Sequence, residues 1–560
     1  MEVHPANEFY LQTREIATGN VVGCAGALEV VPVSQVRLPP APVLDVHAYL
    51  ADVPYTTSKE ARRAVTSSQN GIRGDAGVDI SDHGLTLDDE FPDEFEEGLV
   101  QEIYRRLTRT SVSDIPGPEP ESLVLGNLRQ FFQCQAGEID FKWQELYGDV
   151  VRFKGPFGED RLLVSDPKAL QHIYQTSRYD FAKQAERREV SRLISGRGVL
   201  WAHGHDHQRQ RKIMNPAFGP RETKAFAPLF SDVASKLGGK WKDFISQSPN
   251  QESVIDMTKW IGPATLDAMG IAAFDYEFGT LDNSDNELGN VFANMCVEVF
   301  GSLSAKDILR QALAGYLPKA IFRYIGDNAP NHRLEQLRKA SAVATKVAKE
   351  LIDGKVEALE VGKGKSDVMS LLVQANVSED ESTRMSEEEM IAQMRTFLLA
   401  GYETTATSLC WALLEIARHQ DVQTKLRHEI HRKEREIRER GDRGLSASDF
   451  DTMPYLTAVI KESLRFHPAS PSTYRETMKE DVLPLLKPIT TLSGKVITEL
   501  PVPKGLKVVT SINGYNRHKD VFGSDSHVYD PERWLVPGRI EKTAYVGVYG
   551  NLLSFAGGVR

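Results

Sequence analysis

Small and polar residues interrupt the longest helical pattern in this chain of 560 residues. The pattern covers roughly residues 386–419, and a helical wheel places Gly401, Thr404 and Thr405 on one side. Glycine inside a helix costs about 1 kcal/mol relative to alanine, so Gly401 needs an explanation. One is close packing against another helix, and the other is a notch against which a flat ligand lies. In the second case, Glu403 and Thr404 form a carboxylate and hydroxyl pair that can move protons.

A second pair of chemically active residues lies in a helix expected over residues 454–466, with Pro454 in its first turn. Glu462 and Arg465 are three residues apart, on the side opposite to the apolar positions. The wheel alone therefore predicts an exposed ion pair worth less than about 1 kcal/mol.

Three alternating histidines, His203, His205 and His207, suggest a metal site. No Cys/His pair follows them at a suitable spacing, so no metal ligand is predicted. If a helix begins near Asp206, His207 and Arg211 share one of its faces because they are four residues apart.

The elements that must position these groups are mainly helical. Strand patterns are short, and the fold class is therefore mainly α with small β-sheets. A hairpin is expected at Val150–Phe153 and Arg161–Val164, and a helix begins at Asp166 and Pro167. Further helices are expected near residues 225–250, 290–315, 333–360, 387–419 and 420–440, and strands near 496–498 and 507–512.

Charge divides the chain near residue 114. Residues 1–114 hold 9 Lys and Arg against 19 Asp and Glu, whereas the rest holds 58 against 59. This composition predicts that residues 1–114 form an acidic, largely disordered leader with a helix near 93–109, or alternatively a regulatory module. Residues 115–560 then form one globular domain.

Neither part has a basic excess, which excludes nucleic acid as a partner. No apolar stretch is long enough to span a bilayer, and no signal peptide is expected.

Four short motifs in order resemble those of the cytochrome P-450 family, the haem-thiolate monooxygenases, in the fungal microsomal type. The similarity covers residues 115–560. The motifs are Ala400-Gly401-Tyr402-Glu403-Thr404, Glu462-Ser463-Leu464-Arg465, Pro531-Glu532-Arg533-Trp534 and Phe555-Ala556-Gly557-Gly558-Val559-Arg560. Each motif alone is weak, whereas four in the right order are specific.

The resemblance implies a cytochrome P-450 fold, a haem cofactor and a role for each motif. Glu462, Arg465 and Arg533 would form a buried network, which reverses the prediction from the wheel. Gly401, Glu403 and Thr404 would face the side of the haem where oxygen binds, with Thr404 as hydrogen-bond donor and Glu403 in the proton relay.

The resemblance also implies how the haem is held. The propionates would be bound by the basic side chains His207, Arg211, Arg475 and Arg560. Phe555 and Gly558 would belong to the haem-binding loop.

The implied activity is the insertion of one oxygen atom of O₂ into a small apolar substrate. Electrons would come from NADPH through a flavoprotein reductase. Family members of this type are usually anchored in the endoplasmic reticulum membrane, but no anchor is recognised here, so the location stays open.

The family motif would continue with the haem-ligand cysteine two positions after Arg560, where the printed chain ends. The expectation is a domain incomplete at its C-terminus, without the thiolate and the following helix, and therefore inactive. The alternative is a non-catalytic fragment or partner-binding protein. The four cysteines, Cys24, Cys134, Cys296 and Cys410, are each expected to be small buried side chains.

Overall fold

The computed structural model describes residues 10–14, 29–30, 111–283, 286–291, 303–314, 317, 319–360, 367–376, 384–442, 444–541 and 544–558. All of them belong to one compact unit, made of residues 1–32 and 109–560. The acidic stretch and the helix expected near 93–109 lie outside the described residues. Within the expected leader, the structure describes two short strands, β1 (Tyr10–Arg14) and β2 (Glu29–Val30).

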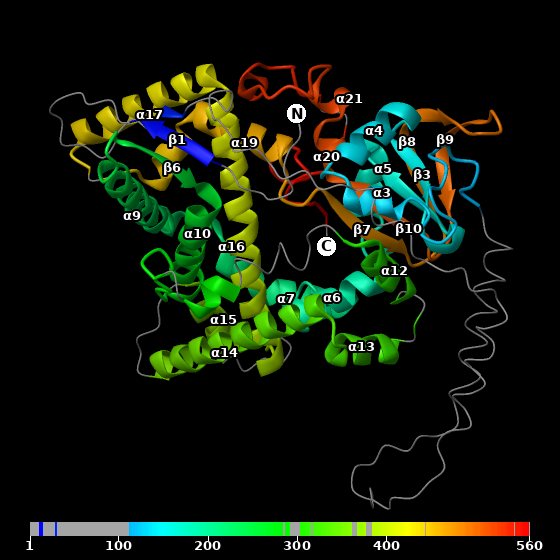
Figure 1. The fold of residues 1–560 in the computed structure, drawn as a ribbon, viewed down its shortest axis with the longest axis horizontal. Helices are drawn as coiled ribbons and strands as arrows, with labels where there is room; N and C mark the ends of the chain where they lie inside the picture. The colour runs from blue at the N-terminus through cyan, green and yellow to red at the C-terminus, as the bar shows by residue number, and fades with distance from the viewer. Residues whose placement is uncertain are drawn as a thin grey trace, which may run out of the picture. The chain divides into compact units, whose positions relative to one another are not determined.

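The described unit is mainly helical with small sheets, as predicted (Figure 1). The first helices are α3 (Leu128–Gln133), α4 (Glu138–Tyr147), α5 (Pro167–Gln171), α6 (Ala185–Ser195), α7 (Gly204–Met214), α8 (Pro220–Ala225), α9 (Ala227–Ser246) and α10 (Met257–Phe274). They are followed by α12 (Ala305–Ala314), α13 (Lys319–Asn328), α14 (His332–Glu360), α15 (Val368–Asn376), α16 (Glu387–Arg418), α17 (Gln420–Arg440), α18 (Ala447–Asp451), α19 (Pro454–Phe466), α20 (Ile512–Asn516) and α21 (Lys519–Phe522).

The longer predicted helices are confirmed in α9, α14, α16, α17 and α19. The helix expected over residues 290–315 is described only in part. Residues 292–302 lie outside the described residues, and α12 covers the end of the prediction.

A five-stranded sheet holds the strand order β3-β4-β10-β7-β5. Its strands β4 and β10 are parallel, and the other neighbours are antiparallel. The predicted hairpin is confirmed as β3 and β4. The strands are β3 (Val150–Lys154), β4 (Asp160–Val164), β5 (Phe181–Lys183), β7 (Ser472–Thr477) and β10 (Lys507–Ser511).

Two smaller sheets complete the described strands. β8 (Asp481–Thr490) and β9 (Val496–Val502) form an antiparallel hairpin. β1 pairs with both β2 and β6 (Glu252–Asp256), so residues 10–14 are joined to the domain by backbone hydrogen bonds.

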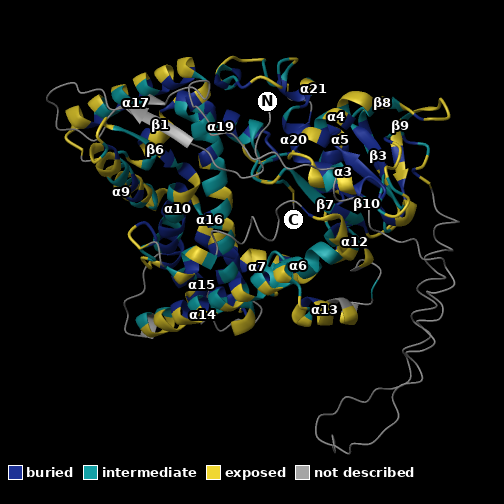
Figure 2. Ribbon diagram, viewed as in Figure 1, coloured by how far each residue is buried: buried dark blue, intermediate teal, exposed yellow. Residues whose placement is uncertain are grey.

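The helix α16 runs between α10 on one side and α19 with the five-stranded sheet on the other (Figure 1). A capping box starts it: the Ser386 hydroxyl accepts the backbone N–H of Glu389, whose carboxylate accepts the N–H of Ser386. The first half of α16 is buried in a core shared with α10, α14 and α15 (Figure 2). No helix in the described part of the chain is both long and apolar enough to span a bilayer.

Candidate functional site

Midway along α16, the side chains are exposed although the helix crosses the inside of the unit. Leu398 on the N-terminal side and Cys410 on the C-terminal side are buried, whereas Thr404 and Thr405 between them are exposed. Polar side chains that face open space within a helical domain are typical of a ligand site rather than of a packed core.

Gly401 lies at the edge of this open stretch and touches α10. A Cβ built on Gly401 would overlap the Cε atom of Met269. Helix packing therefore explains the missing side chain in this structure. This contact does not conflict with a ligand against the neighbouring Thr404, because the open face begins one turn further on.

Thr404 donates its hydroxyl to the carbonyl oxygen of Ala400 over 2.7 Å, one turn earlier in the helix. Such bonds from threonine to the preceding turn are common inside helices and hold the side chain in one rotamer. The lone pairs of the Thr404 hydroxyl remain on its exposed side. Glu403 lies beside it and is half-buried.

The helix α7 is fixed against α16 by two buried amides. Gln393 accepts the Val199 N–H over 3.1 Å and donates to Gln210 over 2.9 Å. Gln210 in turn donates to Glu389 over 2.9 Å, and Arg209 pairs with the same carboxylate. This chain of amides sets the position of α7 relative to the open stretch of α16.

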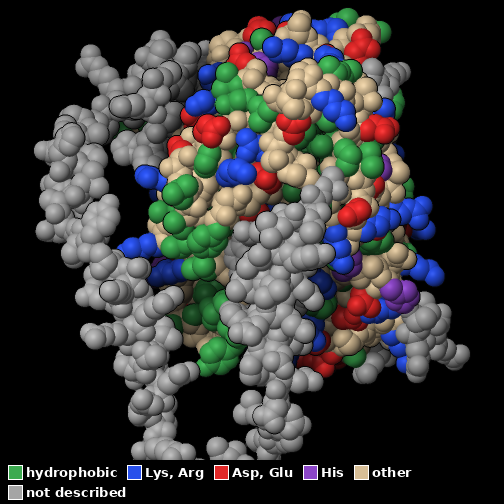
Figure 3. All heavy atoms as spheres, turned by 90° about the vertical axis from the view of Figure 1, so that its right-hand side faces the viewer, with side chains coloured by type: hydrophobic (Ala, Val, Ile, Leu, Met, Phe, Trp, Pro, Cys, Tyr) green, Lys and Arg blue, Asp and Glu red, His purple; other side chains and the backbone are tan. Residues whose placement is uncertain are grey.

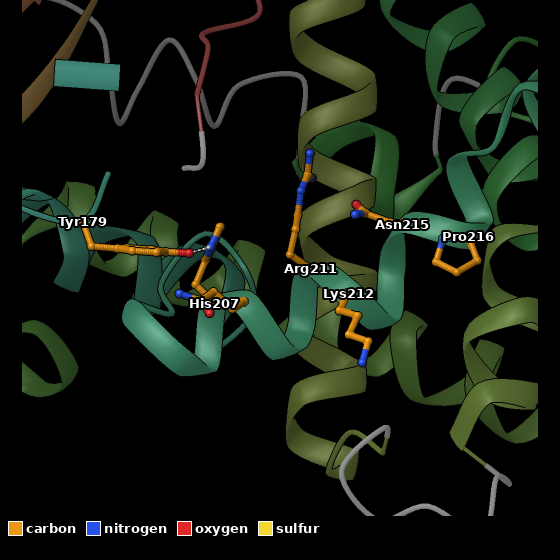
Figure 4. Close-up of a pocket in the computed structure, with 7 residues that line it drawn as sticks. Tyr179, His207, Arg211, Lys212, Asn215 and Pro216 are labelled. Carbon is orange, nitrogen blue, oxygen red and sulfur yellow. Dashed lines mark hydrogen bonds between the residues drawn. The ribbon is translucent and has the colours of Figure 1, made fainter. Parts of the chain in front are cut away.

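His207 and Arg211 lie on α7 and line one cavity of about 580 Å³, together with Tyr179, Gln208, Lys212, Asn215 and Pro216. His207 is buried, and its Nδ1 atom lies 3.0 Å from the hydroxyl of Tyr179. In Figure 4, the Tyr179 ring points at His207, while the exposed Arg211 extends away from Lys212. The prediction that His207 and Arg211 lie on one helix is confirmed, and both side chains line the same cavity.

Arg475 on β7 is a buried cation, with only 6% of its surface exposed. Its guanidinium lies 5.5 Å from the centre of the Tyr174 ring and makes a long bond of 3.4 Å to the Tyr474 carbonyl. Within residues 111–558, as far as they are described, no carboxylate pairs with Arg475. A buried guanidinium without a carboxylate is suited to hold one from a ligand.

The segment that contains the fourth motif packs on the five-residue π-helix η4 (His172–Thr176). Gly558 has φ of +78°, and a Cβ there would overlap the Tyr174 carbonyl oxygen, so the position requires glycine. Phe555 is 59% exposed. Arg560 lies outside the described residues.

Glu462 and Arg465 are both completely buried, so the prediction of an exposed pair from the wheel was wrong. Two bonds of 2.8 and 2.7 Å join Arg465 to the carboxylate, and Arg465 also donates to the carbonyls of Asn516 and Ser526. The helical wheel gave the wrong prediction because the segment around residues 516–534 covers the second side of α19. Periodicity within one helix cannot show that a segment so much later in the chain packs on it.

The third member of the network, Arg533, is buried but lies 3.6 Å from the Glu462 carboxylate. The carboxylate instead receives the Trp534 indole N–H and the Asp530 backbone N–H, each over 2.9 Å. The guanidinium of Arg533 pairs with Asp525 and with backbone carbonyls. Trp534 was not predicted to be a hydrogen-bond donor to Glu462, because a tryptophan at this place in the motif is taken for a bulky aromatic side chain.

The cysteines are only partly as expected. Cys410 is buried on α16, and burial raises the pKa of its thiol to about 11, which keeps it protonated. Cys134, after α3, is exposed, so the prediction of a buried side chain was wrong there. Cys24 and Cys296 lie outside the described residues. No group of three or more His, Cys, Asp or Glu that could hold a metal occurs in the described ranges.

The described site thus consists of a long helix with an open polar centre, a buried Glu-Arg pair on a second helix and a loop that requires glycine, all in one mainly helical unit. Among the described residues, the buried Arg475 has no carboxylate partner and the exposed Arg211 lines the cavity on α7, and such side chains are suited to bind the carboxylates of a ligand.

Comparison with known proteins gives the family. The family model for cytochrome P-450 matches residues 116–560. The chain is 34% identical over 469 residues to cytochrome P-450 monooxygenase 205 of Postia placenta, which covers 81% of this chain and 82% of the relative. It is 32% identical to cytochrome P-450 monooxygenase claU of Ampulloclitocybe clavipes, with 83% and 84% covered. This chain therefore belongs to the cytochrome P-450 family.

A solved structure agrees with the fold. The retinoic acid-bound cyanobacterial CYP120A1 matches with a TM-score of 0.57 and 19% identity, covering 79% of this chain and 86% of that chain. At this identity, the match supports the cytochrome P-450 fold.

Proposed function

We propose that this protein is a haem-dependent monooxygenase that inserts one oxygen atom of O₂ into a small apolar organic substrate. NADPH would supply the electrons through a flavoprotein reductase. The observation that carries the proposal is the exposed Thr404 in the middle of a helix that is otherwise packed within the domain. Membership of the cytochrome P-450 family supports it.

The basic side chains around the site would hold the haem propionates. Arg475 offers a buried guanidinium, and Arg211 and His207 line one cavity on α7. Arg560 would add a further guanidinium. Haem, when bound, supplies the activation of O₂, and the chain supplies the surroundings in which this occurs.

Thr404 and Glu403 would handle the protons that the reaction consumes. While the Thr404 hydroxyl donates to the Ala400 carbonyl, its oxygen can accept a hydrogen bond on its open side. If the hydroxyl rotates, it can instead donate to a ligand bound at this side. Glu403 is half-buried one residue away and can exchange protons with solvent. Gly401 keeps α16 close to α10 and so fixes this stretch of helix.

The experiment is a titration of the purified chain with hemin, followed by reduction, addition of carbon monoxide, and an assay of NADPH consumption with a reductase. Saturable hemin binding and substrate oxidation would support the proposal. Thr404→Ala should uncouple NADPH use from product formation. Thr424→Ala is the matched control, because the exposed Thr424 makes the same 2.8 Å bond to the previous turn of α17. Equal effects of both substitutions would contradict the role of Thr404.

The alternative is a haem- or partner-binding protein without catalysis. The carbon monoxide spectrum separates the two candidates. A Soret band typical of thiolate ligation supports the monooxygenase, and its absence with saturable hemin binding supports the second candidate.

A further inference from the structure

Tyr174 links three parts of the candidate site and is not part of any motif discussed above. It lies in the π-helix η4, a conformation that is rare and often occurs at functional sites. Only 3% of its surface is exposed. Its hydroxyl contacts β7 and β10, its ring contacts a second residue of β7, and its carbonyl oxygen contacts the loop at Gly558.

The hydroxyl of Tyr174 completes a triangle of hydroxyl groups. It lies 2.8 Å from Thr473 Oγ1 and 2.8 Å from Thr510 Oγ1, and these two oxygens are 2.7 Å apart. Thr473 and Thr510 are direct partners across β7 and β10. The triangle therefore fixes the end of the Tyr174 ring to one position on the sheet.

The ring of Tyr174 extends from this point along β7. Arg475 is two residues after Thr473, so both side chains leave the same face of the strand. The Arg475 guanidinium lies 5.5 Å from the ring centre, which is within the range of a cation–π contact. The backbone of Arg475 is held from the other side, because its carbonyl accepts the Gln184 amide over 3.1 Å.

The carbonyl oxygen of Tyr174 contacts the loop that contains the fourth motif. Gly558 lies so close that a Cβ would overlap this oxygen. Gln175, the next residue of η4, donates to the carbonyls of Tyr545 and Val546, so the whole segment 544–558 is tied to the same π-helix.

We infer that Tyr174 is a positioning residue for the cofactor: its ring, pinned by the hydroxyl triangle, holds Arg475 toward a propionate, and its carbonyl sets the place of the loop at Gly558. The inference rests on the proposed haem binding. If Tyr174 were only part of the core, replacing it would lower the stability of the fold but would not change the contribution of Arg475 to hemin affinity.

The test is a double-mutant cycle on hemin affinity, measured by equilibrium titration of the full chain, with circular dichroism to confirm folding. Tyr174→Leu removes the ring and should weaken hemin binding about fivefold, the loss expected for one partly buried cation–π contact. Tyr174→Phe keeps the packing and loses only the triangle, so it should weaken binding about twofold. In an Arg475→Gln background, both effects should disappear.

Tyr455→Leu is the matched control, since Tyr455 is a buried tyrosine that lies under Lys425 in another part of the core. It should lower stability without changing hemin affinity. If the Tyr174 substitutions weaken hemin binding equally with and without Arg475, the inference is overturned. If Tyr174→Leu does not fold, Tyr174→Phe decides in the same way. A wild-type chain that shows no saturable hemin binding would instead contradict the proposed function.

Discussion

Trp534 donates its indole N–H to the buried carboxylate of Glu462 over 2.9 Å, while the neighbouring Arg533 stays 3.6 Å from that carboxylate. The carboxylate thus receives four hydrogen bonds, two from Arg465, one from Trp534 and one from the Asp530 backbone. Full pairing is what makes a buried charge tolerable.

We predict that Trp534→Phe lowers the free energy of unfolding by about 1–3 kcal/mol, because a lone pair of a buried carboxylate loses its donor. Urea denaturation would measure the change. Trp241→Phe is the control, since the buried Trp241 N–H has no hydrogen-bond partner among the described residues and its loss should be nearly neutral. A smaller loss at Trp534 than at Trp241 would contradict the importance of this bond.

Gly401 gives a second prediction, which separates helix packing from a ligand notch. In the wild-type background, Gly401→Ala must displace Met269. In a Met269→Ala background that obstacle is gone, and the same substitution should stabilise the protein by about 1 kcal/mol through helix propensity. Thermal unfolding of the four variants gives the coupling. Equal effects in both backgrounds would show that Met269 is not the reason for the glycine.

The helices α16 and α19 were predicted from the sequence, whereas the burial of Glu462 was not predicted from its helical position. Periodicity correctly predicted α16 and α19, because both helices have apolar residues at helical spacing, α16 begins with a capping box and α19 has Pro454 in its first turn. It placed Glu462 on the wrong side, since the covering segment comes more than 50 residues later. The resemblance to the family motifs, in contrast, correctly implied that Glu462 is buried. The exposed Cys134 and the π-helix at Tyr174 left no comparable signal in the sequence, because both depend on contacts between distant segments.

The amide pair Gln210 and Gln393 should be strongly coupled. Removing Gln210 alone, as in Gln210→Leu, leaves the buried Gln393 amide without its acceptor and should cost about 1–3 kcal/mol. Gln210→Leu with Gln393→Leu should cost less than the sum of the single changes, because no amide is then left unpaired. A cycle of unfolding free energies tests this. Additive losses would mean that the two amides do not act as one connection between α7 and α16.

The last prediction concerns pH. Asp140 at the start of α4 is buried, and burial raises the pKa of its carboxyl to about 6, against a hydrogen bond from Ser511 that lowers it. A carboxyl with a higher pKa in the folded state binds more protons there than in the unfolded chain. Its ionisation therefore costs stability, and the cost grows as the pH rises from about 4 to about 6 and is constant above that.

Asp140→Asn keeps an oxygen acceptor for Ser511 and removes the charge. We expect the variant to gain stability relative to the wild type between pH 5 and pH 8, by on the order of 1 kcal/mol. Urea denaturation of both proteins at the two pH values measures the difference, and other titrating groups cancel because both proteins contain them. A stability difference that stays constant with pH, or that shrinks toward pH 8, would show that Asp140 is ionised in the folded state throughout this range.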